Sequence, residues 1–312
     1  MEKNTFGKVS ASYRKRYGLQ RKVIYEGICS PTTFTRAETE ERNLDFLVIE
    51  TLLARMGKRS VGFESMLREE DGALWEKRLE IKVAVSNGDY PAVDRGIQEY
   101  RLQVSQENWL HEQFCLYYEM KLAERNGKDQ DKVCKLAARA LALTKEKFDL
   151  PDQQNNLYTP MEMDMLLALV RNRQGEWKAS CRVESGLLDI VRYMEICYQE
   201  DRHEDIEGDV WLELIKVSEC SDENGKELYY IEKALKCFDG TTGIRRLAEL
   251  HFIKAKLIER WKRAGDGCKD WLRECMEECR MAHTIYAIMG MDRERNAVEK
   301  YCEEELQWHI TI

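Results

Sequence analysis

The chain has 312 residues, of which 43% are hydrophobic and 34% are charged, with only four prolines and a net charge of −8. This composition predicts an almost entirely helical protein with a strongly charged surface. There is no run of about 18 apolar residues and no apolar signal-peptide core near the start, so we expect neither a membrane span nor secretion by that route.

The first sixty residues predict a compact bundle of four short helices. The first is expected over 5–16 and the second over 20–26, which Gly27 ends because glycine adopts the left-handed conformation without steric cost. The third follows Ser30, a good N-cap residue, and the fourth is expected over 44–56.

The charge of this N-terminal bundle differs from that of the rest of the chain. Residues 1–60 hold 12 basic and 7 acidic side chains, a net charge of +5, which leaves −13 on the remainder. A basic unit joined to an acidic body is expected if only the first unit meets a polyanion.

The third helix is unusually polar. Phe34 and Ala37 lie three residues apart and are expected to face Val23, Ile24 and the fourth helix. The side chains left facing outward are Thr32, Thr33, Thr35 and Arg36. Small polar residues on the outer face of such a helix are typical of a helix that reads the major groove of DNA.

Beyond residue 60 the pattern changes to longer helix pairs. Helices are expected over 63–70, 73–86, 90–104, 107–125, 129–145, 160–173, 176–199, 205–219, 225–237, 243–264, 267–290 and 292–308. The turn at Asn87–Gly88 and its echo at Asn224–Gly225 resemble tetratricopeptide repeats, whose period is about 34 residues. The sequence therefore predicts an all-α fold, with a helix-turn-helix domain over 1–60 and a right-handed tetratricopeptide-like α-solenoid over 61–312. Whether the array is continuous or broken at the irregular segment 146–159 stays open.

No catalytic motif or phosphate-binding glycine loop occurs, so we expect no enzyme and no cofactor. Cys275, Cys279 and His283 recur at helical spacing, but one helix face cannot supply converging ligands, so we expect a packing stripe and no metal. The 11 cysteines are scattered and odd in number, which favours reduced thiols in a cytoplasmic protein.

The segment QRKVIYEGICSPTTFTRAETEER resembles the helix-turn-helix of the XRE, or phage-repressor-like, DNA-binding family. The residues that match in register are Gln20, Ser30, Thr33, Phe34, Arg36 and Glu38, followed by Arg42. The resemblance covers about residues 5–58. With the chemistry of the side chains, it implies DNA contacts by Gln20, Arg21, Lys22, Ser30, Thr32, Thr33, Thr35, Arg36 and Arg42.

Three departures from the family pattern bear on this prediction. Glu40 replaces the glycine that usually follows the recognition helix, Ile24 replaces a common alanine, and Pro31 occupies a position that often reads a base. Acidic side chains there would repel phosphate, and we hypothesise that Glu38 instead pairs internally with Arg14.

A repressor-like N-terminal domain followed by tetratricopeptide-like helices resembles the RRNPP-type regulators, in which short signalling peptides bind the repeats and alter DNA binding. The segments RLEIKVAVSNGDYPAVDRGIQEYR and LHEQFCLYYEMKLAERNG carry this resemblance. Candidate peptide contacts are Asn156, Arg171, Asn172, Tyr193, Tyr229 and Tyr230. For each of them, ordinary surface or inter-helix packing is the alternative interpretation.

We therefore expect a transcriptional regulator that binds a double-stranded, palindromic operator as a homodimer and senses a short peptide in quorum sensing. The alternative is a protein-interaction module whose N-terminal bundle is purely structural.

Overall fold

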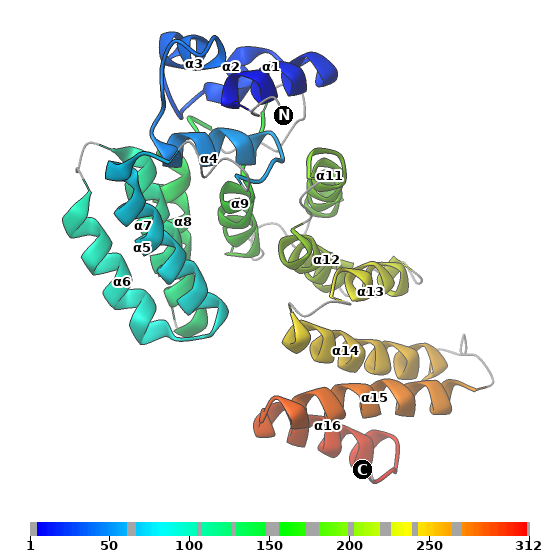
Figure 1. The fold of residues 1–312 in the computed structure, drawn as a ribbon. Coiled ribbons are helices and arrows are strands. Elements are labelled where there is room, and N and C mark those ends of the chain that lie inside the picture. The colour runs from blue at the N-terminus through cyan, green and yellow to red at the C-terminus, as the bar shows by residue number, and fades with distance from the viewer. Residues whose placement is uncertain are drawn as a thin grey trace. The chain divides into compact units, whose positions relative to one another are not determined.

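The computed structural model describes residues 5–60, 67–104, 108–126, 129–147, 156–172, 181–198, 203–218, 226–238, 243–263 and 270–310. All regular elements among these residues are α-helices (Figure 1). They are α1 (Phe6–Tyr17), α2 (Arg21–Tyr25), α3 (Pro31–Glu38), α4 (Phe46–Arg55), α5 (Glu69–Ser86), α6 (Tyr90–Gln103), α7 (Trp109–Asn126), α8 (Gln130–Ala142), α9 (Pro160–Asn172), α11 (Cys181–Cys197), α12 (Glu204–Ser218), α13 (Lys226–Cys237), α14 (Ile244–Arg263), α15 (Trp271–Ile288) and α16 (Asp292–Glu305). No helix in this described part of the chain is long and apolar enough to cross a membrane.

The predicted helices agree with these bounds to within a few residues in most cases. The predicted helix 63–70 is not found as a separate element where the structure describes it: residues 67 and 68 are not helical, and residues 69 and 70 begin α5, which continues through the break expected before residue 73. Residues 63–66 and most of the irregular segment 146–159 lie outside the described residues. Ser30 is the N-cap of α3, and its Oγ accepts a hydrogen bond from the backbone N–H of Thr33 at 3.1 Å, as the cap chemistry predicts.

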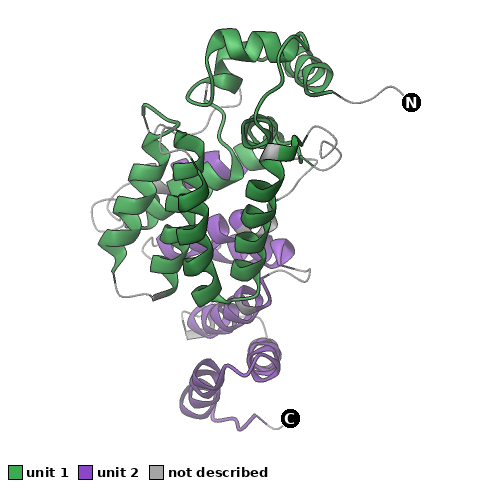
Figure 2. Cartoon of the chain, turned by 60° about the vertical axis from the view of Figure 1, so that its left-hand side comes forward, with its two compact units in different colours: residues 1–179, 192–203 green, residues 180–191, 204–312 purple. Residues whose placement is uncertain are grey.

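The chain divides into two compact units, which Figure 2 colours separately. Unit 1 comprises Met1–Ala179 and Arg192–His203, and unit 2 comprises Ser180–Val191 and Glu204–Ile312. The four N-terminal helices therefore share a unit with the first repeats. The division into two units does not test the domain boundary expected near residue 60, which stays a prediction.

We call residues 5–58, which carry α1 to α4, the head. Its core is apolar: Phe34 and Ile24 are 0% exposed, and the rings of Phe6 and Phe34 form a T-shaped pair with centroids 6.2 Å apart. The inward orientation expected for Val23, Ile24, Phe34 and Ala37 is confirmed. Burying these side chains fixes which face of α3 is left for solvent.

The repeats of unit 1 begin with the antiparallel pairs α5–α6 and α7–α8. Their core includes Tyr100, Phe114 and Tyr118, with the rings of Phe114 and Tyr118 4.7 Å apart. Asp89 caps α6 by accepting from the N–H of Ala92 at 3.1 Å. The turn identified in the sequence at Asn87–Gly88 thus joins the two helices of one pair.

Unit 2 contains α12 to α16, and its C-terminal core holds three buried thiols. Cys275, Cys279 and Cys302 are each 0% exposed, and the Cys275 thiol donates to the carbonyl oxygen of Ala255 at 3.2 Å. His283 is also buried, and its Nε2 lies 2.7 Å from Glu299 Oε1. The packing interpretation of this stripe is confirmed. Among the described residues, no three His, Cys, Asp or Glu side chains are grouped so that they could hold a metal ion.

Candidate DNA-binding surface and its attachment to the repeats

The outer face of α3 is polar and accessible. Thr32 and Arg36 are exposed, while Thr33 and Thr35 are half-buried. Phe34 on the opposite face locks the rotation of the helix, so Arg36 and Thr32 keep a defined direction. Arginine can bind guanine bidentately and threonine can contact a base edge or a methyl group, so this face has the chemistry of a groove reader.

The start of α2 and the chain after α3 place further polar groups at the surface of the head. Gln20 is exposed at the N-cap of α2, and Arg21 and Lys22 are exposed in its first turn. Arg42 lies beyond α3, and its Nη1 is 3.4 Å from Thr33 Oγ1, which draws it toward the outer face of α3. These positions suit contacts to phosphate.

Glu38, the last residue of α3, turns inward. Its Oε1 accepts from Arg14 Nε at 3.1 Å and its Oε2 accepts from Arg21 Nε at 2.6 Å. The hypothesised pair with Arg14 is confirmed, and Arg21 is a second partner that the sequence did not indicate. The carboxylate is neutralised within the head and does not oppose an approaching phosphate.

Glu40 has a backbone conformation that favours glycine. Its φ is 64°, in the left-handed region, and its side chain accepts a hydrogen bond from the hydroxyl of Thr5, the N-cap residue of α1. The hydrogen bond from Thr5 thus stabilises the turn after α3, although the positive φ of Glu40 introduces some backbone strain. Glu40 and Glu41, the next acidic residues after Glu38 in the sequence, are exposed.

A buried ion pair attaches the head to the repeats. Arg55 Nη2 lies 2.8 Å from Glu162 Oε1, and both side chains are 0% exposed. Arg55 belongs to the last turn of α4 and Glu162 to the first turn of α9. Burial by itself would raise the pKa of Glu162, but the charges of Arg55 and Lys145, with hydrogen bonds from Arg55 and Thr144, lower it to about 2.

The same guanidinium also bonds backbone groups from both sides of this junction. Arg55 donates to the carbonyl oxygens of Ile24 and Glu26 in the head and of Thr144 in the repeats. Glu162 accepts in addition from the hydroxyl of Thr144 at 2.5 Å. The donors and acceptors of this buried network satisfy one another, as a buried charge requires.

The turn between α2 and α3 rests directly on the repeats. The indole Nε1–H of Trp109, the first residue of α7, donates to the carbonyl oxygen of Gly27 at 2.9 Å. Gly27 has φ of 75°, and a Cβ on it would collide with the carbonyl of Thr144. Sequence reasoning missed Arg55, Trp109 and Glu162, because a pair 107 residues apart leaves no periodic signal.

The candidate peptide contacts in unit 1 make different interactions. Asn156 Oδ1 accepts from Lys145 Nζ at 3.1 Å, and Arg171 Nη1 lies 3.6 Å from Glu124 Oε1. The side chain of Asn172 lies outside the described residues. Tyr193 is buried, and its hydroxyl donates to the carbonyl oxygen of Tyr158, so its position is that of a packing residue.

The two candidate tyrosines of unit 2 differ in exposure. Tyr230 is 3% exposed, and its hydroxyl donates to Glu184 Oε1 at 2.5 Å. Tyr229 is 51% exposed, and Lys233 Nζ lies 5.6 Å from its ring centroid. Among the three candidate tyrosines, Tyr229 therefore offers the largest exposed surface to a ligand. Tyr193 and Tyr230 are buried and act as packing residues.

A row of polar side chains runs across α7 and α9 in unit 1. Tyr117 donates to Asp164 Oδ2 at 2.9 Å, and Lys121 forms ion pairs with both Asp164 and Glu124. Burial raises the pKa of Glu124, since desolvation outweighs the nearby charge of Lys121. The spacing of four residues between Tyr117 and Lys121 on one helix could have indicated this row from the sequence.

Comparisons with known proteins support the architecture. No protein-family model and no curated protein matches the chain. Among solved structures, the chain is similar to PlcR of Bacillus thuringiensis, determined in complex with the peptide PapR7 and DNA. The TM-score is 0.53 with 13% sequence identity, over 96% of this chain and 99% of that one. This likeness confirms the expected all-α fold, a helix-turn-helix bundle followed by tetratricopeptide-like repeats.

Proposed function

We propose that this chain is a cytoplasmic DNA-binding transcriptional regulator of the XRE type whose repeats sense a short peptide, as in RRNPP-type regulators. The observation that carries the proposal is the accessible polar face of α3, with Thr32 and Arg36 outward and Phe34 fixed in the core. The fold likeness to PlcR, which was solved with a peptide and DNA, supports the same reading.

In this proposal Arg36, Thr32, Thr33 and Thr35 contact base edges in the major groove. The phosphates on either side are bound by Gln20, Arg21, Lys22, Ser30 and Arg42. Two heads of a homodimer occupy palindromic half-sites about one helical turn apart. A peptide that binds one arrangement of the repeats better than another shifts the population of DNA-competent dimers.

The buried Arg55–Glu162 pair gives this coupling a physical route. A change at α7, α8 or α9 reaches the turn between α2 and α3 through groups in direct contact, namely Trp109, Thr144 and Glu162. The polar row on α7 and α9, with Tyr117, Lys121 and Arg171, is the candidate peptide surface of unit 1. Tyr229 is the candidate in unit 2.

The experiment is a titration of a duplex carrying the chain's own promoter, against a duplex of scrambled sequence, at several salt concentrations. Arg36→Ala and Thr33→Ala are expected to lose the preference for the promoter, by about 1–3 kcal/mol for Arg36. Lys22→Ala is the matched control, expected to weaken both duplexes equally and to reduce the salt slope by about 1.

The rival function is a protein-interaction module with a structural head, which the complete burial of Arg55 against the repeats also suits. That function predicts no preference for any duplex in the wild-type protein. Equal binding of both duplexes by wild type and by Arg36→Ala would therefore exclude the regulator.

A further inference from the structure

Glu38, the last residue of α3, bonds two arginines that differ in position. Its Oε1 accepts from Arg14 Nε at 3.1 Å, and its Oε2 accepts from Arg21 Nε at 2.6 Å. Arg14 lies in α1, whereas Arg21 is the first residue of α2 and one of the side chains that we propose to bind phosphate. A single carboxylate thus links α1 to a side chain at the proposed DNA-binding surface.

The carboxylate of Glu38 is itself held in place. Its side chain is 3% exposed, and it ends a helix that Phe34 and Ala37 anchor in the core of the head. Because Arg14 occupies one oxygen, a change of rotamer at Glu38 would break that ion pair as well as the one with Arg21. Glu38 therefore offers Arg21 an acceptor whose position is fixed.

The bond through Nε leaves the outer end of the Arg21 guanidinium available. An arginine has five N–H donors in a planar fork, and the four on the two Nη atoms remain when Nε is bonded. The guanidinium has no second polar partner among the described residues. Two parallel N–H groups of this kind match two oxygens of a phosphate.

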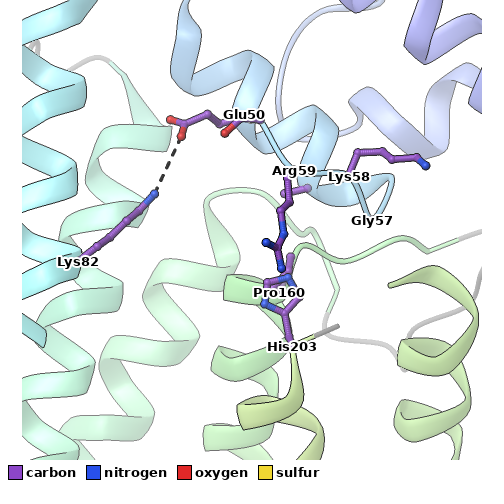
Figure 3. A pocket seen from close by; sticks show the side chains of 9 residues that line it. Glu50, Gly57, Lys58, Arg59, Lys82, Pro160 and His203 are labelled. Atoms are coloured by element: carbon purple, nitrogen blue, oxygen red, sulfur yellow. Dashed lines mark ion pairs between the residues drawn. The ribbon is translucent and has the colours of Figure 1, made fainter. Parts of the chain in front are cut away.

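The surface around Arg21 differs from the side of the head that faces the repeats. On that side a cavity of about 250 Å³ lies between α4, α5 and the first residue of α9. Figure 3 shows Glu50 of α4 and Lys82 of α5 facing each other there, with 4.0 Å between Oε1 and Nζ. Neither Arg21 nor Glu38 lines this cavity. Arg21 lies outside the enclosed region, and its side chain is 45% exposed.

We propose that Glu38 is a positioning residue for DNA binding, which holds Arg21 by its Nε so that the two Nη groups face a phosphate. This inference rests on the proposed function. An arginine that is already held loses less rotamer freedom when it binds phosphate, so the contact is stronger than that of a free side chain. Because Glu38 belongs to the same helix as Arg36, the phosphate contact also keeps a fixed register relative to the base-reading face.

Two variants of Glu38 separate positioning from charge. Since Glu38 shares Arg21 with the phosphate, its negative charge also reduces the attraction between Arg21 and the phosphate. Glu38→Gln removes this charge and leaves one acceptor oxygen in place of two. Glu38→Asp keeps the charge but withdraws both oxygens by one methylene group. Weaker DNA binding in both variants is the result expected of a positioning residue.

The test is a double-mutant cycle on the binding of the full chain to a duplex carrying its own promoter. We expect Glu38→Gln and Glu38→Asp each to weaken binding about three- to tenfold. Arg21→Gln should weaken binding at least as much and lower the salt slope by about 1. In the Arg21→Gln background, either change at Glu38 should cause no further loss, because the side chain that Glu38 positions is already absent.

Glu26→Gln is the matched control for the charge. Glu26 pairs with Lys22, another proposed phosphate contact, at 3.2 Å, but both side chains are exposed, so neither holds the other in place. We expect this variant to bind the duplex at least as tightly as the wild type.

A second measurement does not involve DNA. In the NMR spectrum of the wild-type protein, the Nε–H of Arg21 should give a resolved signal that exchanges slowly with solvent, identified by its loss in Arg21→Gln. Glu38→Gln should abolish the protection of this signal, and Glu26→Gln should not affect it. Circular dichroism checks that each variant is folded, and Glu38→Asp completes the cycle if Glu38→Gln is not.

Three outcomes would overturn the role of Glu38. They are tighter binding by Glu38→Gln than by the wild type, an equal loss from the Glu38 variants in both backgrounds, and an unprotected Nε–H of Arg21 in the wild type. A wild-type protein that prefers neither its promoter nor a scrambled duplex would reject the proposed function together with this role. A clear preference for the promoter without coupling in the cycle would reject the role of Glu38 alone.

Discussion

Arg55 and Glu162 form a fully buried ion pair at 2.8 Å that joins α4 of the head to α9 of the repeats. Each charge has other partners as well: backbone carbonyls for the guanidinium, and the Thr144 hydroxyl for the carboxylate. Removing only one partner of such a pair strongly lowers the stability of the fold, because the remaining charge stays buried without a partner of opposite charge.

We expect Arg55→Met alone and Glu162→Met alone each to lower the free energy of unfolding by about 3–5 kcal/mol. The double variant Arg55→Met/Glu162→Met should lose less than the sum, since no unpaired charge remains. Urea unfolding followed by circular dichroism measures all three. Additive losses in the double variant would mean that the two side chains are not coupled.

The lowered pKa of Glu162 predicts a specific loss of stability in acid. The group binds its proton more weakly in the folded state, so its contribution is fully present above the unfolded pKa of 4.5 and is lost as the pH falls toward the folded pKa of about 2. Between those values we expect a loss on the order of 3 kcal/mol from this group. Unfolding midpoints measured from pH 5 to pH 2 test this, and Glu162→Gln should flatten that part of the profile.

The internal bridge at Glu38 predicts unequal coupling to its two arginines. Arg14 has a side chain 22% exposed and Arg21 one 45% exposed, so solvent screens the second pair more. A double-mutant cycle of Glu38→Gln with Arg14→Gln should give about 1 kcal/mol, and less with Arg21→Gln. Lys22–Glu26, which is open to solvent on both sides, is the reference pair and should give no more than about 0.5 kcal/mol. Equal coupling in all three cycles would contradict the assigned role of Glu38.

The left-handed conformation of Glu40 predicts that glycine is better tolerated there than at its neighbour. Glu40→Gly relieves a backbone strain of about 1 kcal/mol, partly offset by the greater freedom of glycine in the unfolded chain and by loss of the bond from Thr5. Glu41→Gly removes the same charge without that relief. We expect Glu40→Gly to be the more stable variant by about 0.5–1 kcal/mol in chemical denaturation. The reverse order would mean that the Thr5 bond outweighs the strain.

The sequence was most informative where the cause is local. The Ser30 cap, the inward face of Phe34 and the bounds of α3 follow from side-chain chemistry within a few residues. The Arg14–Glu38 pair was also within reach, because both residues belong to one small bundle. The positive φ of Glu40 agrees with the position at which the family pattern has glycine.

Contacts between distant segments could not be predicted in this way. Arg55 resembles any exposed basic residue at the end of a helix, and its burial depends on partners more than 80 residues away. Tyr193 and Tyr230 were predicted as ligand contacts, but both are buried by contacts with other segments of the chain. A tyrosine on an amphipathic helix can face a ligand or a neighbouring backbone, and here both hydroxyl groups bond within the protein.

The docking of the α2–α3 turn on the repeats affects how this head could be exchanged between proteins. Gly27 is fitted against Thr144 and bonded to Trp109, while Arg55 needs Glu162 to neutralise it. In a chimera that joins residues 1–60 to the repeats of another protein, the guanidinium of Arg55 would have no carboxylate partner. Gly27 would have no matching backbone to pack against. The head therefore cannot be transferred to another protein by itself. A functional chimera would also need Trp109, Thr144 and Glu162 at the corresponding positions of its repeats.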